Sequence, residues 1–152
     1  MADLPQPTSG PCLVTLANGD LFYSGGWAYP PNNLQRTSYR YIKQENRWEQ
    51  KADMSDKRNI HACGRVTNPT SGKEEVVVVH GATPSGNRVS STEIYTVEDD
   101  TWRIGTPLPH AISGAASLPY EDSFLILGGG RAGVPCMDTI YKVERYTHRK
   151  IS

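Results

Sequence analysis

The sequence has no excess of charge of one sign, no long hydrophobic run and few cysteines. Its 16 basic and 16 acidic residues give a formal net charge of zero, so net charge offers no argument for binding to nucleic acid or to a membrane. The longest apolar runs, 76–79 and 124–127, hold four residues each, whereas a bilayer-spanning helix needs roughly 20. The N-terminal residues lack the basic start and apolar stretch of a signal peptide. These absences favour a cytoplasmic protein with no membrane or nucleic-acid partner.

The three cysteines are odd in number and have no paired spacing, so they do not indicate a disulfide framework. Cys12 and Cys63 lie at matching places in two apolar segments, and we expect both to be buried free thiols. Cys136 is expected in a loop. The four histidines lie far apart and no Cys-x-x-Cys motif is present. The sequence therefore predicts no metal site, no cofactor and no catalytic group.

What the sequence does have is a high content of turn-forming residues, with 14 glycines and 11 prolines. These residues disfavour a helical bundle, and no stretch of the chain has the pattern of an amphipathic helix. The sequence therefore predicts an all-β protein.

An internal repeat organises the chain. Three short apolar runs, 21–24, 76–79 and 124–127, each end in small residues that include Gly25, Gly81 and Gly128. A tyrosine follows in each unit, and an aromatic or histidine residue lies seven positions beyond it: these pairs are Tyr41 with Trp48, Tyr95 with Trp102, and Tyr141 with His148. The markers keep their order at intervals of roughly 50 residues, which is typical of a repeat architecture.

Each unit is interpreted as four strands. The predicted strands are 11–16, 20–26, 37–44 and 47–53 in the first unit, 61–68, 75–81, 91–98 and 101–106 in the second, and 112–119, 123–129, 138–144 and 147–151 in the third. One four-stranded sheet cannot bury both of its faces alone, so the units are expected to stack on each other.

These residues resemble kelch repeats, which combine an apolar strand, a glycine pair, a tyrosine, a tryptophan and a linker with Met or Leu-Pro. Met54 and Leu108-Pro109 occupy the linker position. Two positions depart from the pattern: Gly81-Ala82 replaces the second glycine pair, and His148 replaces the third tryptophan. The resemblance implies one β-propeller blade per unit, at 11–54, 55–107 and 108–152, after a linker-like segment at 1–10.

Propellers usually close with 4–8 blades, and this sequence contains three. We therefore expect either a larger kelch propeller of which this chain is a part, or an arc that self-association with a second copy completes.

The charges divide between the two ends of the predicted blades. The loops that join second to third strands, and those between blades, carry Arg36, Lys57, Arg58, Arg88 and Arg131, with Asp56 opposing them. The opposite turns carry Glu45, Glu74, Glu75, Glu98, Asp99, Asp100, Glu121, Asp122 and Glu144, with Arg47 and Lys73 opposing them. Two interpretations remain open: the charges are only solvated, or the basic end receives an acidic segment of a partner.

We predict a partner-binding site on the basic end, because loops on a rigid scaffold usually carry binding residues and because arginine and aromatic side chains dominate binding interfaces. The candidate residues are Trp27, Tyr29, Arg36, Arg58, Asn59, Asn87, Arg88, His110 and Arg131. Packing of Trp27 against its own blade is an equal alternative.

The resemblance implies a non-catalytic protein-binding module, such as a scaffold or the substrate-recognition part of a ubiquitin-ligase adaptor. Two alternatives remain. The first is a fragment of a kelch-like enzyme of the galactose-oxidase type, which would need a set of His and Tyr copper ligands and a Tyr–Cys crosslink. The second is a truncated propeller without activity of its own.

Overall fold

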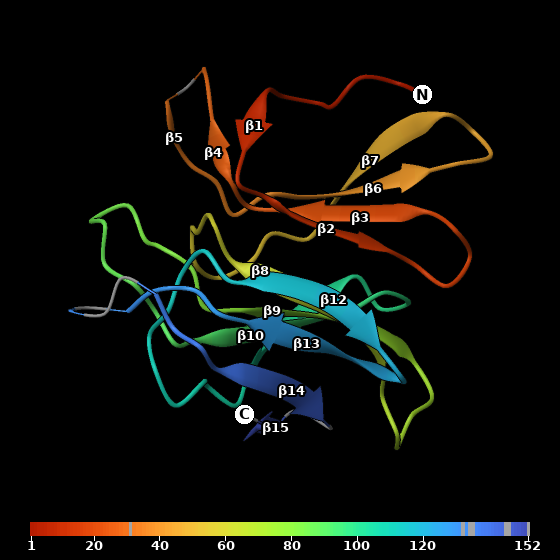
Figure 1. Ribbon diagram of the computed structural model, residues 1–152. Coiled ribbons are helices and arrows are strands. Elements are labelled where there is room, and N and C mark those ends of the chain that lie inside the picture. Colours follow the sequence, from red (N-terminus) through yellow and green to blue (C-terminus); the bar gives the residue numbers. More distant parts are fainter. Residues whose placement is uncertain (31, 132, 134–135, 145–146, 152) are drawn as a thin grey trace.

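The computed structural model describes residues 1–30, 32–131, 133, 136–144 and 147–151 (Figure 1). Positions 31, 132, 134, 135, 145, 146 and 152, which include parts of the predicted loops and the end of the third unit, lie outside this description. All of the regular elements in the described residues are β-strands, so the all-β prediction is confirmed. Among the same residues, no helix has the length and apolar character needed to cross a membrane.

Three four-stranded antiparallel sheets, the blades, follow one another along the chain. Blade 1 consists of β2 (Cys12–Thr15), β3 (Leu21–Ser24), β6 (Ser38–Ile42) and β7 (Arg47–Lys51). Blade 2 consists of β8 (Ala62–Thr67), β9 (Glu74–Val79), β10 (Thr92–Thr96) and β11 (Thr101–Gly105). Blade 3 consists of β12 (Ala116–Tyr120), β13 (Ser123–Leu127), β14 (Ile140–Glu144) and β15 (Thr147–Lys150). A small sheet beside blade 1 consists of β1 (Thr8–Ser9), β4 (Trp27–Ala28) and β5 (Asn33–Leu34).

The blades stack face against face, and β8 of blade 2 contacts both β2 of blade 1 and β12 of blade 3 (Figure 1). The longest aliphatic run of the sequence, 76–79, lies in strand β9, which is covered on both faces. Val76 and Val78 belong to the core shared with blade 1, while Val77 and Val79 belong to the core shared with blade 3. Successive side chains of a strand point to opposite faces, so a strand covered on both sides is apolar at every position.

Aromatic contacts fill the interface between blades 1 and 2. The ring of Phe22 stacks on Tyr95 with centroids 4.5 Å apart and lies 6.1 Å from Trp102. Between blades 2 and 3, Phe124 instead packs directly on Gly64. A Cβ atom at Gly64 would lie 2.1 Å from Cγ of Phe124, so only glycine fits this close approach.

The repeated Tyr and Trp residues hold the segment that precedes their blade. In blade 2, Tyr95 OH donates to Asp100 Oδ1 at 2.7 Å, and the same oxygen accepts the Ala52 N–H at 2.9 Å. Trp102 Nε1 then donates to the Ala52 carbonyl at 2.8 Å. Asp100, which Tyr95 holds in place, and Trp102 therefore clamp residue 52 through both of its backbone polar groups.

Blade 1 repeats this clamp on the N-terminal segment. Tyr41 OH and Ala2 N–H both donate to Asn46 Oδ1 at 2.7 Å, and Trp48 Nε1 donates to the Ala2 carbonyl at 3.3 Å. In blade 3, the Nε2 atom of His148 lies 2.8 Å from the carbonyl oxygen of Thr106. His148 thus takes the place of the third tryptophan in contacting the preceding segment.

The register of blade 3 corrects one repeat assignment. Tyr41 pairs with Trp48 and Tyr95 pairs with Trp102 across their hairpins, but the residue opposite His148 is Val143. Tyr141 pairs with Lys150. The spacing of seven residues is preserved in the third unit, but the register places Val143, not Tyr141, opposite His148, so the equivalence of Tyr141 with the other two tyrosines is wrong.

The second glycine pair is also shifted by one position. The first residue of each pair donates its N–H to the segment before the third strand: Gly25 to Thr37, His80 to Ser91, and Gly128 to Thr139. His80 has a φ of 48° and Gly81 has a φ of 116°, so the expected pair Gly81-Ala82 is in fact His80-Gly81. His80 therefore occupies a backbone conformation that is uncommon for residues other than glycine.

Cys12 and Cys63 are buried as predicted, but the prediction that they are free thiols is wrong. Cys12 on β2 and Cys63 on β8 form a disulfide with their Cα atoms 5.9 Å apart. The two residues are 51 positions apart in the sequence, but stacking of the blades places the first strands of neighbouring blades side by side. Cys136 is free and exposed.

Candidate functional site

The loops that join second to third strands, and those between blades, lie at one end of the blades, on the left in Figure 1. We call this end the loop face. Backbone bridges connect these loops to each other, and they join Asn59 to Ala82, Ala82 to Arg88, Val89 to Ile112, and Ser113 to Gly130. The loop face therefore has a hydrogen-bonded framework on which side chains are displayed.

The aromatic candidates lie on the part of the loop face that belongs to blade 1. Trp27 on β4 pairs with Ser9 and Leu34, and its Nε1 donates to Asn32 Oδ1 at 3.1 Å. Tyr29 follows, with 70% of its surface exposed against 37% for Trp27. Tyr29 is thus presented to solvent, whereas Trp27 is partly packed and partly accessible.

Polar candidates occupy the middle of the loop face. Arg36 lies 3.5 Å from the carboxylate of Asp53, a pair that is well exposed on the arginine side. Asn59 is half-buried and its backbone is bound to Ala82. Asn87 is exposed and donates from Nδ2 to Ser85 Oγ at 3.1 Å. Arg36 and Asn87 can therefore accept a partner more readily than Asn59.

The structure brings three cationic or titratable candidates together at blades 2 and 3. The exposed Arg88 donates from Nε to Ser113 Oγ at 3.0 Å and lines a hollow of about 310 Å³. His110 and Arg131 line a second hollow of about 270 Å³, together with Asp138. Both hollows are lined by Cys136 and Met137, so they are neighbours on the loop face.

Arg58 does not belong to the exposed surface, and its prediction as a surface residue is wrong. Its side chain is fully buried and lies 2.7 Å from the equally buried Glu93. It also donates to the carbonyl oxygens of His80 and Ser91, and Glu93 accepts the backbone N–H of Ser55 at 2.6 Å. This pair ties the linker before blade 2 to strand β10, a structural role that requires both charges to stay paired.

Two buried histidines lie near this ion pair. Burial, followed by the positive charge of Arg58, lowers the pKa of His61 to about 3 and likewise that of His80. Both imidazoles are therefore neutral at physiological pH. Among the residues that the structure describes, no group of three or more His, Cys, Asp or Glu side chains could hold a metal ion.

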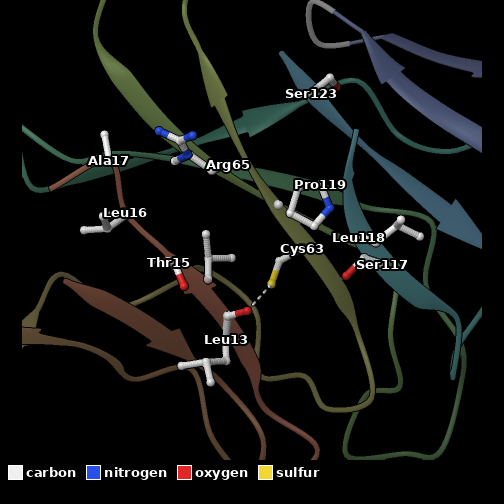
Figure 2. Close-up of a pocket in the computed structure, with 12 residues that line it drawn as sticks. Leu13, Thr15, Leu16, Ala17, Cys63, Arg65, Ser117, Leu118, Pro119 and Ser123 are labelled. Atoms are coloured by element: carbon white, nitrogen blue, oxygen red, sulfur yellow. Dashed lines mark hydrogen bonds between the residues drawn. The ribbon is translucent and has the colours of Figure 1, made fainter. Parts of the chain in front are cut away.

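A groove of about 490 Å³ runs along the first strands of the three blades (Figure 2). Leu13, Leu118 and Pro119 contribute apolar surface, and Arg65 is the charged residue of its lining. Sequence reasoning missed this groove. Part of the signal was present in the alternation of β2, where Leu13 lies between the buried Cys12 and Val14 and remains 60% exposed. Leu118 is 43% exposed on β12, a strand that is exposed at every position.

The division of charge between the two ends is smaller than the sequence predicted. On the turn side, Glu75 is buried and accepts from Arg103 at 3.1 Å, while Asp99 pairs with Lys73 at 2.6 Å. On the loop face, Arg58 adds no exposed positive charge, because its side chain is buried. The side chain of Glu144 lies outside the described residues.

The fold and the repeated clamps define an arc of β-propeller blades. No protein-family model matches the sequence, but curated relatives do. The chain is 33% identical over 99 residues to the F-box/kelch-repeat protein At2g44130 of Arabidopsis thaliana, and the match covers 64% of the chain and 22% of that protein. It is 30% identical over 128 residues to Kelch-like protein 15 of Homo sapiens, which covers 82% of the chain and 20% of that protein.

Two further comparisons agree with these. Beta-scruin of Limulus polyphemus is 27% identical over 93 residues, which covers 61% of the chain and 10% of that protein. A solved structure titled "Structure of YjhT" superposes with a TM-score of 0.78 at 17% identity, over 100% of this chain and 48% of that one. The chain is a kelch-repeat protein with three repeats. It spans about a fifth of the length of the first two curated relatives.

Proposed function

We propose that this chain is a non-catalytic protein-interaction module that binds an acidic segment of a partner protein through its loop face. Kelch-repeat relatives support a binding role in general. The binding residues in this proposal are Trp27, Tyr29, Arg36, Asn59, Asn87, Arg88, His110 and Arg131.

The observation that carries the proposal is the state of Arg88. Its side chain is exposed and its Nε donates to the neutral hydroxyl of Ser113, and no carboxylate pairs with it among the described residues. An arginine fork in this state can bind a partner carboxylate through two parallel hydrogen bonds. Arg131 lies beside the neighbouring hollow, and the exposed ring of Tyr29 offers apolar contact area on the same face.

Reversal of the charge at Arg88 provides the test. We expect Arg88→Glu to weaken binding of an acidic, aromatic-containing peptide by about tenfold or more, because an attractive charge pair becomes repulsive. Fluorescence anisotropy with a labelled peptide measures this, and the wild-type affinity should fall as salt rises.

The matched control is Arg47→Glu, which reverses a half-exposed arginine at the start of β7, at the opposite end of the blade. This variant should bind the peptide as the wild type does. Equal losses in the two variants would contradict the loop-face assignment, and tighter binding of a lysine-rich version of the peptide would contradict the acidic partner.

Nothing in the described residues favours the enzymatic alternative of the galactose-oxidase type. That chemistry needs a cluster of His and Tyr ligands and a Tyr–Cys crosslink, whereas two of the three cysteines are joined to each other. The adaptor, scaffold and truncated-propeller interpretations stay predictions.

The cytoplasmic location also stays a prediction, and the Cys12–Cys63 disulfide bears against it. Disulfides persist in oxidising compartments and are rare in the cytosol. Fractionation of cells followed by thiol labelling of the chain decides the question.

A further inference from the structure

Each blade has two different faces. In both interfaces between blades of this chain, one kind of face packs on the other kind. We call the face that packs on the following blade the forward face, and the other the backward face. The forward face of blade 1, with Val14 and Phe22, packs on the backward face of blade 2, with Val76, Val78 and Tyr95. The forward face of blade 2, with Val77, Val79 and Ile94, packs on the backward face of blade 3, with Phe124 and Ile126. All of these residues are at most 8% exposed.

Blade 3 has a forward face that no described blade covers. Leu118 pairs with Leu125, and Leu125 pairs with Lys142, in the same register as Val14 with Phe22 in blade 1. Leu118 is 43% exposed and Leu125 is half-buried. The face is thus apolar at Leu118 and Leu125, which correspond to Val14 and Phe22 of blade 1, while Lys142 lies at the position that Arg40 has in blade 1.

Blade 1 has a backward face that is covered only in part. Its outer half lies under the N-terminal segment, which Tyr41, Asn46 and Trp48 clamp. Its inner half ends at Leu13, which is 60% exposed. The equivalent residue of blade 2, Cys63, is only 7% exposed because blade 1 covers it.

We propose that the forward face of blade 3 packs on the backward face of blade 1 of a second copy of this chain, and reciprocally. A twofold axis relates the two contacts. Each copy then uses its blade 3 face in one contact and its blade 1 face in the other, so no face is left open and the two copies form a closed ring. Six blades lie within the range in which propellers close. The groove of Figure 2, whose two sides carry Leu13 and Leu118, then becomes part of the wall of the central channel.

Two observations select a second copy as the occupant. The exposed pair of faces is of the same two kinds that already join blades 1 to 2 and blades 2 to 3. The chain also superposes in full on 48% of the YjhT chain, so two copies supply about as much of this fold as that single chain contains.

Sedimentation velocity across a concentration series tests the proposal. The wild type should form a discrete species of twice the 16.8 kDa of one chain. Leu13→Asp and Leu118→Asp should each raise the dimer dissociation constant by at least about 30-fold, because each places a carboxylate in both apolar contacts. Both residues are already partly exposed in one chain, so the variants should fold. Ile104→Asp, at a 66% exposed residue of the outer strand β11, is the matched control and should remain dimeric.

Mixing the two variants gives the sharpest result. In a mixed dimer, the Leu13→Asp chain contributes an intact Leu118 to one contact, and the Leu118→Asp chain contributes an intact Leu13 to the same contact. The other contact holds both introduced carboxylates. The mixture should therefore regain dimers that neither variant forms alone. A wild type that stays monomeric at all concentrations, open-ended polymers, or a mixture without rescue would each overturn the twofold ring. In the first case the two exposed faces are not covered by a second copy of this chain.

Discussion

Reduction of the Cys12–Cys63 disulfide is expected to lower the melting temperature of this chain by roughly 10 °C. The bond closes a loop of 51 residues, and cross-linking a loop of this length is worth about 4 kcal/mol in the chain-entropy description. For a chain of this size, each kcal/mol shifts the melting temperature by about 2–4 °C. The apolar core between blades 1 and 2 remains after reduction, so the reduced chain should still melt cooperatively. Circular dichroism melts with and without a thiol reductant measure the shift.

Two variants separate this disulfide from other thiol effects. Cys63→Ala should melt near the reduced wild type and should not respond to the reductant. Cys136→Ser removes the free, exposed cysteine and should retain the full response. Alkylation of Cys12 in the unreduced wild type would show that the bond is not formed and would contradict the prediction.

Lowering the pH from 7.5 to 5 is expected to destabilise the fold by about 4 kcal/mol, again a shift of roughly 10 °C. The pKa of His61 and that of His80 fall from 6.5 to about 3 in the folded chain. The unfolded chain therefore binds two more protons than the folded chain between these values, and each contributes about 2 kcal/mol by pH 5. Burial also lowers the pKa of His148, with the same sign.

The sign of this effect is fixed by the direction of the shifts. For a histidine with a lowered pKa, stability is fully present above pH 6.5 and declines as the pH falls toward 3. His80→Asn should remove about half of the slope, and asparagine tolerates the positive φ of position 80 better than most residues. Asn87→Gln, at an exposed position with no titratable group, is the control and should leave the slope unchanged. Melts of equal stability at pH 7.5 and 5 would contradict the prediction.

Local features of the sequence predicted much of the fold. The four-residue run of valines in β9 indicated a strand, and the glycine and tyrosine markers gave the three units. The function of the markers was visible only in part. Trp102 and Trp48 can be recognised from the sequence as large amphipathic residues. Their hydrogen bonds to the Ala52 and Ala2 carbonyls cannot, because these carbonyls lie about 50 residues away along the chain.

The errors have a common cause. Arg58 was expected on the loop face because an arginine in a loop is usually solvated, but Glu93, 35 residues away, is buried beside it. Cys12 and Cys63 have no recognisable spacing in the sequence, yet the stacked first strands bring them together. The placement of Tyr141 followed a spacing of seven, which could not reveal that Val143 is the residue opposite His148 in blade 3.

The sequence by itself determined the all-β class, the three kelch repeats and the end of the blades at which the loops gather. These properties follow from the alternation of side chains along a strand and from turn residues, which act over a few positions. The tertiary structure alone decided which charges are exposed, which cysteines are joined and which blade faces remain uncovered. Those properties depend on contacts between residues about 35 to 50 positions apart, and such contacts arise only when one blade is stacked on the next.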